Sequence, residues 1–188
     1  STPIKSSAAS DVYKRQMSTP LEAAGLNLND TLWSAKALLE CPDLVRKVHY
    51  DYYAAGANAV EACSYQATEA AFARKGIEKA EASRLIRLSG ELVREAKNDV
   101  LLEHPEWDPA DLLTAGSIGP YGAYLADGSE YTGAYDLTRE EYYAFHQLRL
   151  DELLNSGMDI LAIETQPRFD EIEALLAMIA AVSYTHLT

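Results

Sequence analysis

Apolar residues recur every three or four positions in several stretches of the chain, which is the spacing of one face of a helix. Between 42 and 55 this pattern ends at Gly56, a residue type that commonly terminates helices. The same spacing predicts helices over 81–102, from Thr138 and from Phe169. The apolar positions are Leu44, Val48, Tyr52 and Ala55 in the first helix, Leu85, Leu88, Leu92, Ala96 and Val100 in the second, Tyr142, Phe145, Leu150, Leu153 and Leu154 in the third, and Ile172, Leu176 and Ile179 in the fourth.

Each of the first three helices is followed by a short apolar segment, at 58–63, 112–116 and 159–163. Helix, turn and buried strand in repetition are typical of parallel αβ units. A (β/α) barrel and an open doubly wound sheet both fit this pattern. All three segments run into polar or glycine residues, which favours a barrel, because a barrel builds its site from the carboxyl ends of its strands. No Gly-x-Gly-x-x-Gly follows a first strand, so a dinucleotide-binding domain is less expected. We therefore predict an α/β fold that is part of a (β/α)8 TIM barrel.

The two ends of the chain can be encoded by the same DNA sequence, read from opposite strands. Residues 11–16 can be encoded by GAT GTG TAT AAG AGA CAG, which resembles a transposon end used to tag DNA for sequencing. The reverse complement, read in a shifted frame, encodes the Val-Ser-Tyr-Thr-His found at 182–186. We therefore expect 1–16 and 182–188 to be non-native, adaptor-like tails, and 17–181 to be one incomplete barrel domain.

Composition narrows the classes of partner. The chain has 188 residues, 48% hydrophobic and 24% charged, as globular proteins have, and a formal net charge of -13. Such a charge, without a Lys/Arg stripe, argues against nucleic acid as a partner. No apolar run approaches the roughly 20 residues of a membrane span, and no signal-peptide core is present near the start. We expect a cytoplasmic protein without a membrane partner.

Four motifs resemble the homocysteine S-methyltransferase family, in its bacterial S-methylmethionine-dependent type. They are LWSAK at 32–36, SYQAT at 64–68, GSIGPYGAYLADGSEY at 116–131, and Glu164-Thr165 followed by Pro167. The resemblance covers 17–181 in order and corresponds to the N-terminal half of that family. It implies roughly strands 2–4 of the barrel with their helices, and it implies that a first strand with an acidic residue at its end is missing.

The resemblance also implies a reaction. A methyl group moves from a sulfonium donor, S-methylmethionine or S-adenosylmethionine, to the zinc-bound thiolate of homocysteine, giving methionine. Zinc is suited to this step because it deprotonates a coordinated thiol. In the family three cysteines of later strands hold the zinc, and none of them is in this chain. Cys41 and Cys63 lack metal-ligand spacing. We therefore expect no metal ligand, no zinc binding and no catalytic residue in this chain, and no catalysis by it alone.

For the substrates, the resemblance implies that Glu164, with Thr165 beside it, binds the amine of homocysteine. A carboxylate at the end of an apolar strand needs a cation or hydrogen-bond donors, although a role as a loop or helix cap is the alternative. Ser64, Tyr65 and Gln66, at the end of the earlier strand, are weaker candidates for substrate contact or for ordering the loop.

The segment from Gly119 to Tyr135 is expected to be one long loop that acts as a lid. Gly119 and Tyr121 in this segment are candidate substrate-binding residues. Its tyrosines, Tyr121 foremost, are candidates to bind the sulfonium through their aromatic faces with the help of Asp127 or Glu130, unless they only pack the loop down. His49 and His146 are expected to be structural helix residues. Glu61 departs from the family pattern, because an apolar residue is more usual within that strand.

Two other functions stay open. The first is another (β/α) barrel enzyme, aldolase-like or phosphate-binding, although none of the predicted strands ends in the Lys that would support it. The second is a non-catalytic binding domain, for which three or four parallel strands leave open edges. The sequence does not decide the preferred methyl donor, the oligomeric state, or whether the chain folds stably by itself.

Overall fold

The computed structural model describes residues 17–28, 30 and 32–185, without the side chains of 183–185. Of the two expected adaptor-like tails, 1–16 and 186–188 lie outside the described residues. The last helix, α10 (Phe169–Thr185), continues past the expected boundary at 181.

Three strands form a parallel sheet in chain order, as predicted. They are β1 (Ala59–Glu61), β2 (Leu113–Ile118) and β3 (Ile160–Ile163), and β2 lies between the other two. The register pairs Glu61 with Ala115, and Ser117 with Ala162. A small parallel sheet of neighbouring strands is consistent with part of a barrel, and the strands described here do not close into a full one.

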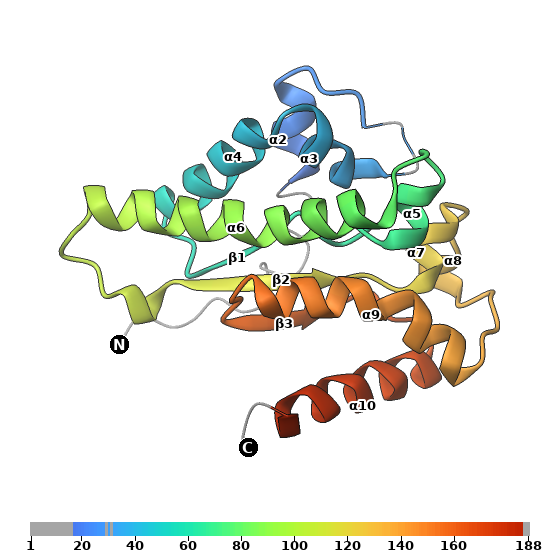
Figure 1. The fold of residues 1–188 in the computed structure, drawn as a ribbon. Helices are drawn as coiled ribbons and strands as arrows, with labels where there is room; N and C mark the ends of the chain where they lie inside the picture. Colours follow the sequence, from blue (N-terminus) through green and yellow to red (C-terminus); the bar gives the residue numbers. More distant parts are fainter. Residues whose placement is uncertain (1–16, 29, 31, 186–188) are drawn as a thin grey trace.

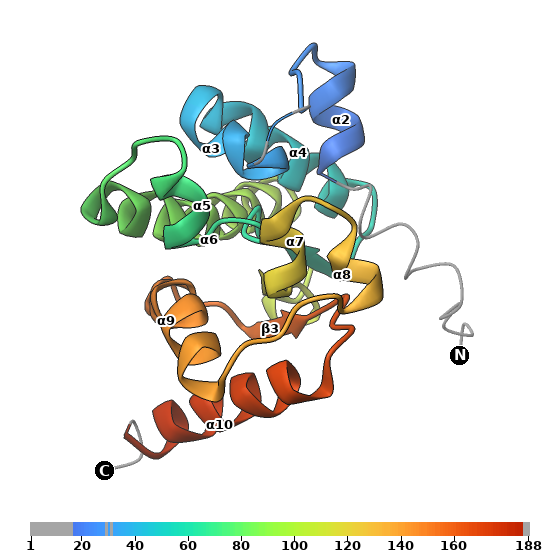
Figure 2. The ribbon, with the colours of Figure 1, turned by 90° about the vertical axis from the view of Figure 1, so that its right-hand side faces the viewer.

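The long helices pack in chain order around this sheet. They are α4 (Pro42–Ala54), α6 (Lys79–Glu103), α9 (Arg139–Asn155) and α10. Helix α4 lies against β1, α6 against β2, α9 against β2 and next to α6, and α10 against α9 (Figures 1 and 2). The shorter elements are α2 (Ser18–Ala23), the 3-10 turn η1 (Trp33–Lys36), α3 (Ala37–Glu40), α5 (Glu69–Ala73) and the 3-10 turn η2 (Pro109–Asp111). The four helices predicted from apolar spacing are thereby confirmed, with boundaries shifted by a few residues.

Local chemistry explains where several helices begin. The side chain of Thr138 accepts a hydrogen bond from the backbone N–H of Glu141, whose carboxylate accepts from the N–H of Thr138, so α9 opens with a capping box. Helix α4 begins with Pro42, whose missing N–H costs nothing at that position.

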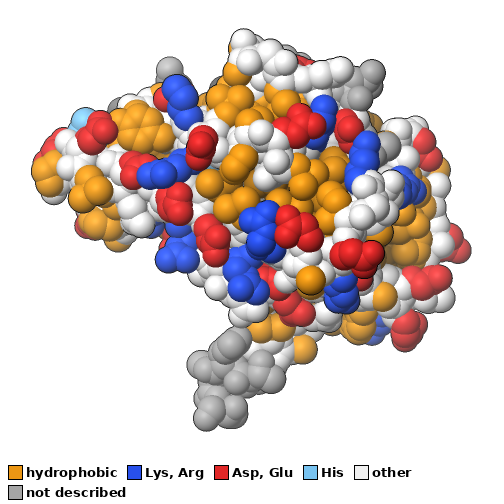
Figure 3. Space-filling model, turned by 45° about the horizontal axis from the view of Figure 1, so that its top comes forward, with side chains coloured by type: hydrophobic (Ala, Val, Ile, Leu, Met, Phe, Trp, Pro, Cys, Tyr) orange, Lys and Arg blue, Asp and Glu red, His pale blue; other side chains and the backbone are white. Residues whose placement is uncertain are grey.

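On the surface seen in Figure 3, Lys and Arg side chains are interspersed with Asp and Glu rather than gathered in one patch.

The helices α6 and α9 approach each other closely at a glycine. A Cβ added to Gly90 would lie 2.2 Å from Oγ and 2.7 Å from Cβ of Ser156. Contacts that short are not found in real structures, so one of the two chains would have to move. Gly90 therefore sets the distance between α6 and the end of α9.

Gly90→Ala should lower the free energy of unfolding by about 1–3 kcal/mol, the usual cost of overpacking. In an unconstrained helix the same change would be stabilising, because Ala exceeds Gly in helix propensity by about 1 kcal/mol. Urea denaturation followed by circular dichroism measures the difference. The double variant Gly90→Ala/Ser156→Gly should regain part of the loss, and a single variant as stable as the parent would disprove the tight contact.

One expectation about the fold is wrong. The segment 119–135 is not one long loop, because it contains the short helices α7 (Tyr121–Leu125) and α8 (Ser129–Thr132). Ala126, Gly128 and Gly133 adopt left-handed conformations between and after these helices. Two single-turn helices separated by glycines give little apolar periodicity, which is why the pattern was not visible in the sequence.

Candidate functional site

The sheet register brings three polar side chains to one face. Side chains alternate along a strand, and residues paired across parallel strands share a face. Ala115 pairs with Glu61 and lies two positions before Ser117, while Ala162 pairs with Ser117 and lies two positions before Glu164. Glu61, Ser117 and Glu164 therefore point to the same side of the sheet.

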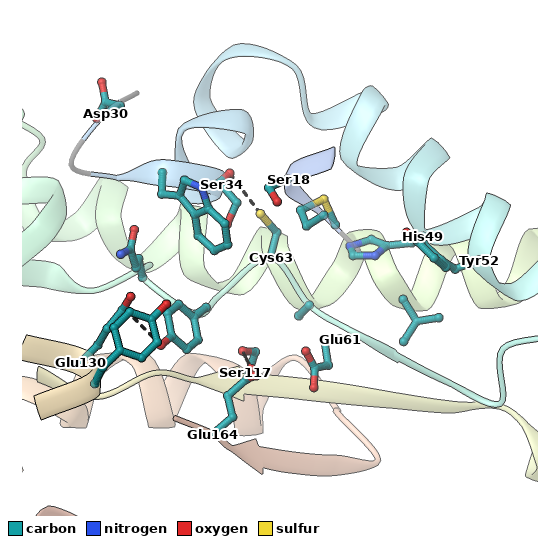
Figure 4. Close-up of a pocket in the computed structure, with 17 residues that line it drawn as sticks. Ser18, Asp30, Ser34, His49, Tyr52, Glu61, Cys63, Ser117, Glu130 and Glu164 are labelled. Carbon is teal, nitrogen blue, oxygen red and sulfur yellow. Dashed lines mark hydrogen bonds between the residues drawn. The ribbon is translucent and has the colours of Figure 1, made fainter. Parts of the chain in front are cut away.

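A cavity of about 650 Å³ opens on that face. The sheet, α4, α8 and the segment that contains η1 all contribute to its wall (Figure 4). Its lining residues are Met17, Ser18, Asp30, Trp33, Ser34, His49, Tyr52, Val60, Glu61, Ala62, Cys63, Tyr65, Gln66, Ser117, Glu130, Tyr131 and Glu164. Four carboxyl groups and no Lys or Arg belong to this set, so the cavity suits a cation.

Two carboxyl groups meet on the floor of the cavity. Glu164 follows β3 directly and accepts a hydrogen bond from the hydroxyl of Ser117. Glu61 reaches the same point from β1, and Figure 4 shows both carboxyl groups beside Ser117. Burial, and then the charge and hydrogen bonding of Glu164, raise the pKa of Glu61 to about 8. Glu61 is thus a neutral acid at pH 7, beside a second carboxyl group.

An aromatic wall borders the same cavity. The rings of Trp33 and Tyr65 meet edge to face, with centroids 6.3 Å apart. The Tyr65 hydroxyl donates a hydrogen bond of 3.3 Å to Glu130, which α8 carries. Aromatic faces next to a carboxylate form a surface that attracts a soft cation.

A buried arginine fixes the backbone of the two segments that follow β1 and β2, one of which includes Tyr65 of this wall. Arg149 of α9 is 1% exposed and donates to the carbonyl oxygens of Tyr65 and Gly119 at 2.6 and 2.7 Å. It also donates to Nδ1 of His146, so the proton of this imidazole lies on Nε2 and is donated to Glu171 at 2.8 Å. Burial lowers the pKa of His146 to about 4, so the ring is neutral between the two charges. His146 is structural here, as the sequence predicts.

Of the seven residues that the sequence proposes for substrate binding, Glu164, Tyr65 and Gln66 line the cavity. The amide of Gln66 donates to the carbonyl oxygen of Ala123, which ties it to α7. The other four, Ser64, Gly119, Tyr121 and Thr165, lie nearby but are not among its lining residues.

The placement of three of these four has a clear structural reason. Ser64 is buried between the strands, donates to the carbonyl of Ser117 and accepts from its N–H. Gly119 lies under the Tyr65 ring, where an added Cβ would come within 2.7 Å of Tyr65. Tyr121 packs among the rings of Tyr124, Tyr135 and Phe145. Thr165 adopts a left-handed conformation, with φ of 53°, in the turn after β3.

Several cavity residues were not proposed from the sequence, namely Asp30, Trp33, His49 and Glu61 as wall or floor residues. Glu130, which the sequence proposes as a carboxylate near the sulfonium, does line the cavity. Glu61 could have been found, because strand alternation places it opposite the buried Val60. His49 could not, since its helical spacing resembles that of any core residue. It is 0% exposed, and neither ring nitrogen has a hydrogen-bond partner.

The described residues do not form a metal site. No group of three or more His, Cys, Asp or Glu among them is arranged to hold a metal ion. Cys63, which lines the cavity, donates its thiol proton to the carbonyl oxygen of Ser34 at 3.1 Å, and burial raises its pKa to about 12. Such a thiol is a poor ligand, because metals bind the thiolate. In the same part of the chain, no helix has the length and apolar character to cross a membrane.

Comparisons with known proteins give one consistent family. The family model described as homocysteine S-methyltransferase matches residues 16–187. The chain is 53% identical over 165 residues to Homocysteine S-methyltransferase of Escherichia coli (strain K12), and 46% identical over 171 residues to Homocysteine S-methyltransferase YbgG of Bacillus subtilis (strain 168).

These alignments cover 88% and 90% of this chain but 53% and 54% of the two relatives, so the chain spans about half the length of the curated relatives it matches. Among solved structures, the metallated form of the homocysteine methyltransferase MmuM from Escherichia coli matches with a TM-score of 0.84 at 53% identity. That match covers 89% of this chain and 57% of the other.

Proposed function

Because the chain belongs to the homocysteine S-methyltransferase family, we propose that its cavity binds homocysteine, with the carboxylate of Glu164 pairing with the amino acid's ammonium group. The observation that carries this proposal is the charge of the wall. Asp30, Glu61, Glu130 and Glu164 line the cavity without a Lys or Arg among the described lining residues. Glu164 directly follows β3, and Ser117 orients its carboxylate by donating a hydrogen bond.

We further propose that a sulfonium donor, S-methylmethionine or S-adenosylmethionine, takes the side of the cavity formed by Trp33, Tyr65 and Glu130. A sulfonium is a soft cation, and a wall of two rings and a carboxylate attracts it without a strong hydrogen bond. This assignment replaces Tyr121 as the aromatic contact, since Tyr121 packs inside a cluster of rings away from the lining residues. Placing both cations in one cavity brings the acceptor sulfur near the donor's methyl group.

In the proposed reaction homocysteine loses its thiol proton to solvent, and its thiolate sulfur attacks the methyl carbon. The bond from that carbon to the sulfonium sulfur breaks, its electron pair stays on the donor sulfur, and methionine forms together with the donor's neutral thioether. The residues of this chain bind and orient the two substrates. We assign no thiol activation to them, because the described residues do not fit a zinc site. The proposed place of the chain in the family fold is roughly the second to fourth strands of a (β/α)8 barrel, whose carboxyl ends form the cavity floor.

The ligand itself offers the first test. Isothermal titration of the chain with L-homocysteine should show binding, whereas 4-mercaptobutanoate, which has the thiol and carboxylate but lacks the amine, should bind at least about 30-fold more weakly. The reason is that removing the ammonium leaves the partly buried carboxylate of Glu164 without its partner, and truncating one member of such a charge pair costs about 2–5 kcal/mol. Equal affinities for the two thiols would refute the role of Glu164.

The same chain supplied with zinc, homocysteine and S-methylmethionine should form no methionine above background. This outcome follows from the lack of a metal-ligand cluster among the described residues. Robust turnover would show that activation of the thiol needs no residue beyond those present.

A further inference from the structure

Glu61 stands out among the carboxyl groups of the cavity. Asp30 pairs with Lys75 at 2.8 Å, and Glu130 accepts a hydrogen bond from Tyr65. Glu61 instead reaches the carboxyl group of Glu164. Two ionised carboxylates in contact would repel each other strongly in a partly buried site, so one of them has to hold a proton.

The hydrogen bonds indicate which carboxyl group holds that proton. The hydroxyl of Ser117 donates to Glu164, so the carboxyl group of Glu164 is the acceptor in this contact. Glu61 can then donate its own proton to Glu164, which agrees with the raised pKa of Glu61, about 8. The pair thus carries one negative charge and one proton, as coupled carboxyl dyads do.

A separate feature of the cavity also indicates a polar ligand. His49 projects from α4 into the same cavity with both ring nitrogens buried and without a partner (Figure 4). Leaving a buried polar group without a hydrogen bond costs about 1–3 kcal/mol. Burial lowers the pKa of His49 to about 3, so the ring is neutral and does not offset the charge of the two carboxyl groups. The cavity therefore contains a carboxyl pair that shares a proton and a histidine whose ring nitrogens have no hydrogen-bond partner.

We propose that Glu61 and Glu164 share one proton in the ligand-free chain and release it to solvent when the ammonium of the amino-acid ligand enters. Glu61 is then a specificity-determining residue that couples ligand binding to pH. The ammonium brings its own N–H donors and positive charge to the position of the proton, so it replaces the proton between the two carboxylates. This inference rests on the proposed function, in which Glu164 receives the ammonium.

Other charged groups facing the pair do not explain the shared proton. The titratable side chains that line the cavity besides the pair are Asp30, His49, Tyr52, Cys63, Tyr65, Glu130 and Tyr131. His49 and Cys63 are neutral at pH 7, because burial lowers the pKa of the one and raises that of the other. Arg149 is the buried cation whose charge acts on Glu164, and its guanidinium donates to two carbonyl oxygens and His146 rather than to the pair.

The first experiment measures proton release and affinity together. Titration calorimetry with L-homocysteine in buffers of different ionisation enthalpy, at pH 7, should give close to one proton released per ligand. Between pH 6 and 7.5, below the range in which the thiol titrates, the affinity for homocysteine should rise about 20-fold. The reason is that a pKa of about 8 leaves Glu61 mostly protonated over this range, so the ligand has to displace a proton, and this becomes easier as the pH rises. In Glu61→Gln, which keeps a neutral donor toward Glu164, both effects should vanish. Glu91→Gln, an exposed position on α6 outside the cavity, is the matched control and should retain both.

The second experiment needs no ligand. Carbon NMR of the glutamate carboxyl groups should show Glu61 titrating near pH 8 in the free chain, and its midpoint should move down in Glu164→Gln. An ordinary midpoint near 4.5 overturns the shared proton, and so does ligand binding without proton release. If homocysteine binds to no variant, the proposed function and the coupled release both fail, while the NMR midpoint still decides separately whether the carboxyl groups share a proton.

Discussion

Glu164→Gln should weaken the binding of homocysteine by about 30-fold or more. Glutamine has nearly the shape of glutamate and can still accept the hydrogen bond from Ser117, so the pocket is kept while the negative charge is lost. Removing one partner of a desolvated ammonium–carboxylate pair costs about 2–5 kcal/mol, and about 1.4 kcal/mol corresponds to a tenfold change in affinity. The expected loss is therefore large against the error of a titration experiment.

The measurement compares dissociation constants for homocysteine in the parent, in Glu164→Gln and in Glu130→Gln. Glu130 also lines the cavity but lies on α8 beside Tyr65, so its substitution should change homocysteine binding by only a few-fold. Thermal unfolding of each variant shows whether the fold is retained. If the two substitutions weaken binding equally, the ammonium is attracted by the general charge of the wall rather than held by Glu164.

Arg149→Met should lower the free energy of unfolding by about 3–5 kcal/mol, as expected when one member of a buried ionic network is removed. Met fills a similar volume but leaves the carbonyl oxygens of Tyr65 and Gly119 without their donor. The buried Glu171, 0% exposed, then loses the positive charge on the far side of His146.

Denaturant unfolding measures this loss, and Arg139→Met provides the control on the same helix. Arg139 is exposed at the start of α9, so its substitution should change stability by no more than about 0.5 kcal/mol. Arg149→Lys keeps the charge but not the planar group that reaches several acceptors, and should fall between the two. Equal stability of Arg149→Met and Arg139→Met would mean that the network contributes no net free energy.

The sequence predicts the framework well because the signals for it are periodic. Apolar spacing located α4, α6, α9 and α10, and the short apolar segments after three of them became neighbouring parallel strands. Glu164 was found for a related reason, since a carboxylate directly after an apolar strand has few structural explanations. The register then places it on the face that bears the cavity.

What the sequence does not predict depends on contacts between distant segments. Ser64 and Gln66 belong to one polar cluster in the sequence, yet only Gln66 reaches the cavity, because Ser64 is taken up by the backbone of Ser117. Hydrogen bonds link Arg149 through His146 to Glu171 and so connect α9 with α10. No local sequence pattern predicts this link, because Glu171 is distant in the chain from the other two. The sequence shows only that Glu61 is an unusual residue for a position within a strand. Its partner, Glu164, became evident from the sheet register.

Gly119 shows how a residue can govern a site that it does not line. Its N–H reaches the carbonyl oxygen of Tyr65, and the space that a side chain would need is occupied by the Tyr65 ring. Any larger residue there would tilt the aromatic wall, even if every wall residue stayed the same. The identity of residue 119 therefore controls the shape of the cavity from outside it, through the position of the Tyr65 ring.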